Sequence, residues 1–375
     1  MDAFSFCPNP ACRLHEKSEG SGWYAPRGSY RTKAFGIVRR YRCKCCGHWF
    51  SQQSFSLDYY AKRKVDYPDL LLRHVSSSSG RAISRAMGIS PDSVQNRLDR
   101  LARQAVGTHA ALLPLIGSNE AICVDGFVSF DVSQYFPSEV TISITSDSRF
   151  VLDLSQTNRR RSGTMTLRQT RRARQLYAES SLEHGGVSRT FREILDSLSV
   201  IQPCVEFVPL IVTTDEKPEY VRVLDRHPLF RAQDERHRVI HRTINSHAPR
   251  NYANPLFASN YLDREIRKDL ANHHRETACF SRNVANGLCR LAAYLFHHNY
   301  IKRFSIKAPC FDRALHGEAA GIPRPSIDRE LSSVFTERRF LSRLKLSPTL
   351  ERIWAKRSPT PLKKNPDYVP GYALQ

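Results

Sequence analysis

Two aspartates at the ends of apolar runs are the residues whose position most directly suggests chemistry. Asp125 follows the run 121–124, and Asp215 closes the run 205–215. Carboxylates held on neighbouring strands can bind a pair of Mg²⁺ or Mn²⁺ ions about 3.5–4 Å apart, an arrangement that cleaves and joins phosphodiesters. An aspartate that only caps a strand or turn would look the same when taken alone. Because both follow β-type runs in a basic chain, the sequence favours the catalytic interpretation.

Five cysteines lie in the first 46 residues, and four of them have the spacing of a zinc site. Cys7 and Cys12 form one pair, and Cys43 and Cys46 form the second. Four thiolates suit the tetrahedral coordination of Zn²⁺, and a site with four protein ligands is closed, so this zinc would be structural. Cys45 could replace Cys43 or Cys46 as a ligand. Reduced structural cysteines without a metal are the alternative.

The runs around the two aspartates predict a mixed α/β domain. β-type segments are expected at 121–125, 140–145, 150–154, 205–215 and 236–244, with helices at 165–184 and 187–198. A ribonuclease-H-like domain has this order of elements: three strands, a helix, a strand, a helix, a strand and a final helix. In that order the first and fourth strands are neighbours, so Asp125 and Asp215 are expected to converge on a five-stranded mixed sheet.

Residues 66–110 have the pattern of short helices joined by turns. Gly88 can end one helix through a positive φ, and Ser90 and Pro91 can begin the next as N-cap and first helical residue. This pattern is typical of a DNA-binding helix-turn-helix, although an ordinary helical hairpin would have a similar polar face. The second helix would expose four polar side chains to DNA: Ser93, Gln95, Asn96 and Arg97.

The charge balance favours a polyanionic partner. Lys and Arg total 57 against 36 Asp and Glu, a formal net charge of +21, and nucleic acid is the commonest partner of such a chain. A basic protein without such a partner is the alternative. A dense positive region is expected to contact DNA phosphates, although a solvated loop would have the same composition. Its candidate contact residues are Arg159, Arg160, Arg161, Arg171 and Arg172.

The sequence does not indicate a membrane protein. No uncharged apolar run approaches the ~20 residues of a membrane-spanning helix. The N-terminal residues lack the basic and apolar regions of a secretory signal. We therefore expect a cytoplasmic, nucleoid-associated protein with no membrane partner.

Two later segments resemble parts of bacterial insertion-sequence transposases of the DDE type. Residues 254–270 are similar to the last catalytic helix of these enzymes, and 275–283, around Phe280-Ser281-Arg282, are similar to their short basic segment. The helix 288–300 resembles the one that closes their catalytic domain. The zinc ribbon, helix-turn-helix and Asp…Asp order also match, over roughly residues 1–305. The resemblance implies a transposase that cleaves double-stranded DNA and transfers the strand to a target, as a homodimer or higher multimer.

The resemblance aligns the third metal ligand, which is usually Glu, with Asn260. Some related insertion-sequence families have Asn there, and its carbonyl oxygen could bind Mg²⁺ more weakly. On a helix Asn260, Asp263 and Arg267 share one face, whereas Glu265 points away. Asp263 is therefore the better acidic substitute, and Arg267 could hold a phosphate.

Four parts are expected along the chain: a zinc ribbon at 1–57, a helix-turn-helix domain at 58–112, a ribonuclease-H-like catalytic domain at 118–305, and a helical extension with a basic tail at 306–375. In the last part we expect one amphipathic helix over 329–346 and an extended or disordered tail after Trp354. A catalytically inactive or domesticated transposase derivative that binds specific DNA is the main alternative function, because Glu is missing at 260. A nuclease without joining activity is a second alternative.

Overall fold

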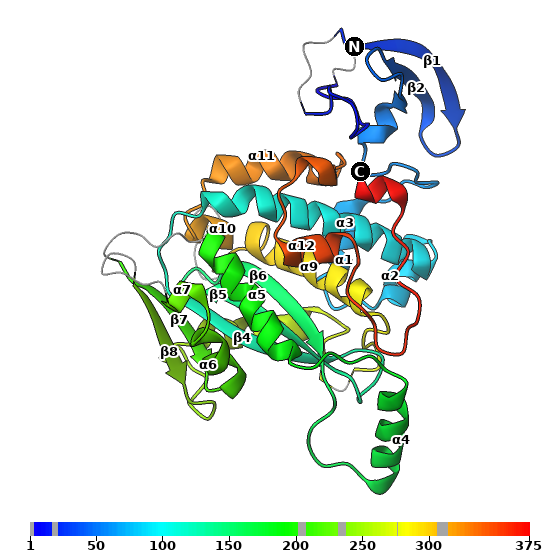
Figure 1. Ribbon diagram of the computed structural model, residues 1–375. Coiled ribbons are helices and arrows are strands. Elements are labelled where there is room, and N and C mark those ends of the chain that lie inside the picture. Colours follow the sequence, from blue (N-terminus) through cyan, green and yellow to red (C-terminus); the bar gives the residue numbers. More distant parts are fainter. Residues whose placement is uncertain (1–3, 17–21, 202–207, 232–237, 276, 306–313) are drawn as a thin grey trace.

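The computed structural model describes residues 4–16, 22–201, 208–231, 238–275, 277–305 and 314–375, and it has mixed α/β architecture (Figure 1). The predicted strand residues 205–207 and 236–237 lie outside the described residues. A three-stranded sheet lies near the N-terminus, and a five-stranded mixed sheet lies in the body of the molecule. No helix among the described residues combines the length and apolar character needed to cross a membrane.

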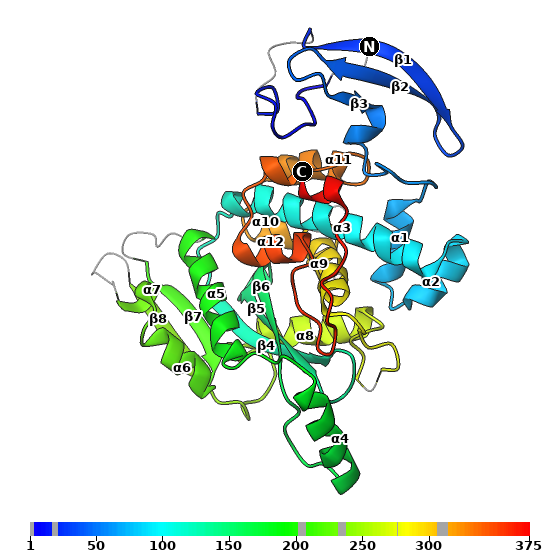
Figure 2. The same cartoon turned by 45° about the vertical axis from the view of Figure 1, so that its right-hand side comes forward.

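The N-terminal sheet has three antiparallel strands, β1 (Tyr24–Thr32), β2 (Gly36–Cys43) and β3 (Trp49–Ser51). It has its own small core, in which Trp23, Tyr41 and Phe50 are buried and Phe4 packs against them. Gly47 adopts a φ of 73°, which lets the chain turn between β2 and β3 so that its N–H reaches the Cys43 carbonyl at 3.0 Å. Figure 2 shows this sheet standing at one end of the molecule.

A helical segment follows: α1 (Tyr67–His74), α2 (Gly80–Met87) and α3 (Pro91–Leu112). Gly88 ends α2 with a φ of 62°, and the Ser90 side chain caps α3 by accepting from the Ser93 N–H, as the sequence predicts. α3 continues as a long helix that packs along α9 (Val284–Tyr300). The third helix of the segment, α3, is therefore also a central helix of the body (Figures 1 and 2).

The main sheet contains β4 (Ile122–Phe130), β5 (Pro137–Thr145), β6 (Val151–Asn158), β7 (Leu210–Asp215) and β8 (Val239–Ile244). Its order is β6-β5-β4-β7-β8. β4, β5 and β6 pair antiparallel, whereas β4, β7 and β8 pair parallel. The expected end of the first strand at Asp125 is wrong: the alternating residues after Gly126 keep pairing with β5, and the strand continues to Phe130.

Among the described residues, five helices lie along the chain between β6 and α9, and most of them pack near this sheet. They are α4 (Leu167–Ala178), α5 (Gly186–Ile201), α6 (Pro218–Leu224), α7 (Pro228–Arg231) and α8 (Phe257–Asp269). α5 packs on β5 and β6, and α8 packs on β4 and β5. α4 projects away from the body in both views (Figures 1 and 2).

The C-terminal region differs from expectation in two ways. It contains α10 (His316–Ala319), α11 (Arg324–Val334) and α12 (Pro348–Trp354), with 3-10 turns at Leu341–Arg343 and Gly371–Leu374. The single helix predicted over 329–346 is wrong, because α11 ends at Val334. The tail is extended but packed: the Trp354 indole donates to the Ala373 carbonyl at 2.6 Å, and buried Lys356 pairs with Asp99 at 2.8 Å.

Candidate functional site

Four cysteines meet at the base of the N-terminal sheet. The sulfur atoms of Cys7, Cys12, Cys43 and Cys46 all lie within 4.8 Å of one another, so this group could bind a metal such as zinc. Within the described part of the chain no other group of three or more His, Cys, Asp or Glu side chains is gathered as closely. Cys45 stands outside the group, although it is exposed like Cys46, and this resolves the ambiguity left by the spacing in favour of Cys43 and Cys46.

The thiols of this cluster differ in acidity. Burial raises the pKa of Cys12 to about 11. At Cys46 burial acts in the same direction, but a backbone hydrogen bond from His48 and side-chain hydrogen bonds outweigh it and lower the pKa to about 7. Cys46 is therefore the readier of these two thiols to become a thiolate, the form that binds a metal.

The outer face of the N-terminal sheet alternates arginines and aromatic rings. The Arg40 guanidinium lies 6.0 Å from the Tyr30 ring centre and 5.7 Å from that of Trp49, and Arg42 lies 6.0 Å from the Trp49 ring. Trp49 is 52% exposed. Exposed rings combined with guanidinium groups can stack on bases and neutralise phosphates, so this face is a candidate nucleic-acid-binding surface.

A second site lies on the main sheet, where acidic side chains surround Lys217. The Lys217 ammonium lies 3.6 Å from an Asp125 oxygen, 3.4 Å from an Asp215 oxygen and 3.6 Å from a Glu139 oxygen. β4 and β7 are adjacent and parallel, which brings Asp125 and Asp215 to the same lysine. The carboxylates are thus arranged around an ammonium group at the start of α6.

Glu139 and Lys217 were not among the candidates that the sequence offered. Glu139 pairs with Val128 across β4 and β5, is fully buried, and also forms an ion pair of 3.0 Å with Arg159. A Cβ atom at Gly126 would approach a Glu139 oxygen to 2.5 Å, so glycine is needed beside Asp125 to leave room for this carboxylate. The only sign of Glu139 in the sequence was the glycine after Asp125. That glycine can be interpreted only once the register between β4 and β5 is known.

The charges of this acidic site depend on one another. Burial disfavours the charge on Lys217, but Tyr220 and the three carboxylates outweigh it and hold the pKa of Lys217 above its usual value. Burial raises the pKa of Asp215, and Asp125 raises it further against the opposing effect of Lys217. Lys217 therefore acts as the internal counter-charge of the site.

We expect Lys217→Met to destabilise the protein by roughly 3 kcal/mol in the absence of divalent cations, because it leaves clustered carboxylates without their cation. Chemical denaturation in the presence of EDTA measures this loss. Lys268→Met is the matched control, since Lys268 is 60% exposed and pairs with Glu265 near the surface, where an ion pair contributes little. Equal stability of the two variants would contradict the role given to Lys217.

On α8 the structure distinguishes between the two candidates for a third ligand. The pKa of Asp263 is raised to about 7 by burial and by the nearby charge of Asp125. The Asn260 amide donates instead to the Leu256 carbonyl at 3.1 Å, one turn back along its own helix. Glu265 pairs with Lys268 and Lys302, away from this face, as expected. Asp263 is therefore the α8 carboxyl that acts electrostatically on the acidic site.

The raised pKa of Asp263 predicts how stability depends on pH. The folded protein holds this proton up to about pH 7, whereas an unfolded aspartic acid has a pKa of 3.8. Stability should therefore fall as pH rises between about 4 and 7, and Asp263→Asn should lack that part of the slope. Urea denaturation in EDTA at pH 5 and pH 8 tests this, with Asp225→Asn on the exposed end of α6 as the control. If the free energy of unfolding depends on pH in the same way in the wild type and in Asp263→Asn, this prediction is wrong.

The arginines proposed to contact DNA have different environments. Arg267 donates to the Val128 carbonyl at 2.8 Å and lies 4.8 Å from the Phe127 ring, so it is bound to β4. Arg159 joins Glu139 and thereby links the basic loop to the acidic site. The other members of the positive region lie on or beside the projecting α4: Arg160 over the Tyr177 ring, Arg161 at Gln134, and exposed Arg171 and Arg172.

The expected exposure of the second helix is only partly correct. Asn96 is exposed, but the predicted exposure of Arg97 is wrong: it is buried and donates to the Arg63 carbonyl at 2.9 Å. The Ser93 hydroxyl contacts Ser90 at the helix cap, and Gln95 joins Asp99 to Arg290. These contacts arise because α3 is packed on several sides, which the polar pattern of its first turns does not reveal.

Comparison of the sequence with protein-family models gives no match, and comparison with curated proteins gives none either, so the interpretation depends on the geometry of these sites.

Proposed function

We propose that this protein is a DNA transposase, an enzyme that cleaves a DNA strand at the end of a mobile element and joins it to a target. The observation that carries the proposal is the gathering of Asp125 and Asp215 around Lys217 on adjacent parallel strands. Asp263, on α8, acts on Asp125. The strand order β6-β5-β4-β7-β8 supports a ribonuclease-H-like catalytic domain.

The donor set of the acidic site suits hard divalent cations. Carboxylate oxygens are the ligands that Mg²⁺ and Mn²⁺ prefer, and Asp125, Asp215 and Asp263 would hold them. Such ions, when bound, activate the attacking hydroxyl and stabilise the leaving oxygen of the phosphodiester. Lys217 occupies the centre of the carboxylates and has to withdraw for an ion to enter. Glu139, held by Arg159, keeps the strand beside Asp125 in place.

The basic surfaces support double-stranded DNA as the partner. The Arg40–Trp49–Arg42 face of the N-terminal sheet and exposed α4 present positive charge in a chain of net charge +21. In this proposal zinc stabilises the N-terminal sheet through the four cysteines. We further propose that the protein acts as a homodimer or higher multimer and is associated with the nucleoid.

A DNA-binding derivative without catalysis is the second candidate. The observation that favours it is the Asn260 side chain, which is bound to the Leu256 carbonyl on its own helix. In that case DNA recognition would remain, and the acidic site would keep only a structural role through its ion pairs with Lys217.

One experiment separates these functions. The purified protein is incubated with linear DNA carrying the flanking ends of its own gene, a circular target plasmid and Mg²⁺ or Mn²⁺. Cleavage at the ends together with covalent donor–target joints supports a transposase. Cleavage without joints indicates a nuclease, and end binding without cleavage indicates the DNA-binding derivative.

A further inference from the structure

A cavity of about 400 Å³ lies between the helix-turn-helix segment and the loop before α9. Its walls come from the first turns of α2 and α3 and from residues 278–283 with the start of α9. Arg81, Arg282 and Arg290 line it, and none of the other lining residues is acidic. None of the carboxylates around Lys217 lines this cavity, so it is distinct from the acidic site.

No carboxylate of the described residues forms an ion pair with these arginines. The charge of Asp99 acts on Arg290, but the Asp99 carboxylate pairs with Lys356 at 2.8 Å. In the part of the chain that the structure describes, Arg81 and Arg282 are exposed at the rim and form no ion pair. Arg290 forms the wall, where its guanidinium donates to the neutral amide oxygen of Gln95 at 3.0 and 2.5 Å. A partly buried guanidinium bound to a neutral amide, beside two exposed ones without ion pairs, favours an anion in the cavity.

The helices around the cavity add to its positive potential. Ser79, Ser90 and Asn283 cap α2, α3 and α9, each by accepting an N–H from the third residue of its helix. The starts of all three helices border the cavity, so the positive ends of their dipoles act on its contents. The positive potential of the three helix N-termini therefore adds to that of the arginines.

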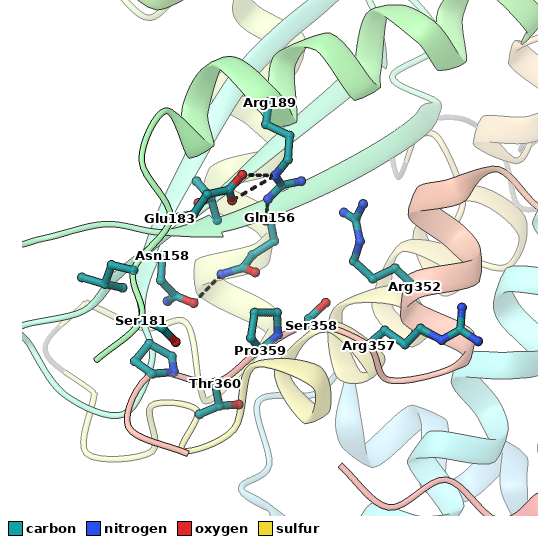
Figure 3. A pocket seen from close by; sticks show the side chains of 13 residues that line it. Gln156, Asn158, Ser181, Glu183, Arg189, Arg352, Arg357, Ser358, Pro359 and Thr360 are labelled. Atoms are coloured by element: carbon teal, nitrogen blue, oxygen red, sulfur yellow. Dashed lines mark hydrogen bonds and ion pairs between the residues drawn. The ribbon is translucent and has the colours of Figure 1, made fainter. Parts of the chain in front are cut away.

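A second cavity shows what a neutralised arginine cluster looks like. It has a volume of about 240 Å³ and lies between β6, the start of α5 and residues 357–361 (Figure 3). There Arg189 pairs with Glu183 at 2.7 Å, Arg352 with Glu193 at 2.7 Å and Arg357 with Glu351 at 3.1 Å. Since each arginine has a glutamate, this cavity has no excess charge to attract an anion.

We propose that the 400 Å³ cavity binds a backbone phosphate of double-stranded DNA. Half of it belongs to the helix-turn-helix segment, and the other half is a loop joined to the end of β4 by the hydrogen bond from the Val132 N–H to the Ser281 carbonyl at 2.7 Å. Asp125 lies on the same strand, roughly 20 Å away at the rise of an extended chain. A duplex would cover that distance in about six base pairs. This inference rests on the proposed function, because it describes how DNA bound at the cavity would run on to the acidic site.

The first test removes the two rim charges. Arg81→Gln/Arg282→Gln should bind a 30-base-pair duplex about tenfold more weakly in 0.1 M salt, and the slope of log affinity against log salt should fall by about two. Fluorescence anisotropy of the zinc-loaded full chain measures both. The control Arg192→Gln/Arg222→Gln removes the same charge from exposed positions on α5 and α6. Equal behaviour of the two double variants would overturn the proposal.

The second test uses the wild-type protein and does not depend on the folding of a variant. Cys279 is exposed and lines the cavity, so bound duplex should slow its alkylation by iodoacetamide several-fold, as followed by mass spectrometry. Inorganic phosphate at millimolar concentration is the comparison. Unchanged alkylation with duplex bound would refute the proposal, and protection by phosphate but not by duplex would assign the cavity to a small phosphate compound.

These outcomes are independent of catalysis. Protection of Cys279 and a reduced salt slope without strand cleavage would retain the phosphate site and reject the transposase activity. Strand cleavage with Cys279 unprotected would retain the enzyme and reject this site.

Discussion

Asp125→Asn is expected to reduce metal-dependent DNA strand cleavage by about 10³-fold or more, while the fold and DNA binding remain. The physical reason is that Asp125 acts on two other groups of the acidic site: it faces Lys217 at 3.6 Å and raises the pKa of Asp263. An amide of the same shape removes one negative charge from the set that would hold Mg²⁺, and metal-ion catalysis contributes several kcal/mol to such reactions. Cleavage of a labelled DNA end over time measures the rate.

The control for this prediction is Asp225→Asn, which removes an exposed carboxylate at the end of α6 and should leave the rate unchanged. Comparing Asp263→Asn with Asn260→Ala then identifies the third ligand. The structure predicts a large loss for Asp263→Asn and a small one for Asn260→Ala, because Asp263 acts on Asp125 and Asn260 is bound to Leu256. Full activity of Asp125→Asn would exclude this site as the catalytic centre.

Local patterns predicted those parts of the structure whose causes are local. The spacing of Cys7, Cys12, Cys43 and Cys46 predicted the cysteine cluster, because metal-binding turns are short. Gly88 and Ser90 marked the break between α2 and α3, because caps depend on neighbouring residues. The β-type segments predicted all five strands of the main sheet, although β4 extends further than expected and β7 begins only at Leu210.

Features that depend on register or tertiary packing could not be predicted in this way. Glu139 reaches the acidic site only because β5 pairs with β4 in a particular register, and Lys217 reaches it because β7 lies beside β4. Arg97 is buried because other helices cover α3, although its neighbours in sequence suggest a polar surface. The tail is ordered by Trp354 and by the ion pair of Lys356 with Asp99, a residue far away in the chain.

Preventing the cysteine cluster from binding zinc, the metal proposed for it, is expected to unfold the N-terminal sheet. Among the described residues its core has six buried members, and three of these are cysteines of the cluster, so little of the buried surface comes from ordinary apolar side chains. Structural zinc contributes an apparent binding energy of about 10–16 kcal/mol at neutral pH in small domains. Cys43→Ser, or a strong chelator, should therefore make the first 57 residues sensitive to protease.

The body of the molecule is expected to survive this change. The N-terminal part is joined to the body by polar and aromatic contacts, among them the His15 ring at 2.8 Å from the Ser342 hydroxyl, Arg343 at 2.7 Å from the His15 carbonyl, and the packing of Phe6 and Phe55 on Phe340. Loss of these contacts leaves α3, α9 and the main sheet packed together. Limited proteolysis should yield a stable fragment beginning near residue 58, and DNA affinity should fall because the Arg40–Trp49–Arg42 face is lost.

Cys45→Ser provides the matched control, since Cys45 is exposed and lies outside the cluster. It should retain one zinc per chain by elemental analysis and resist protease like the wild type, whereas Cys43→Ser should lose the metal. If both variants bind zinc equally, the four-cysteine assignment is wrong. If Cys43→Ser loses zinc yet keeps a protease-resistant sheet, the aromatic packing around Phe50 is sufficient for folding, and the metal has a role other than stabilising this sheet.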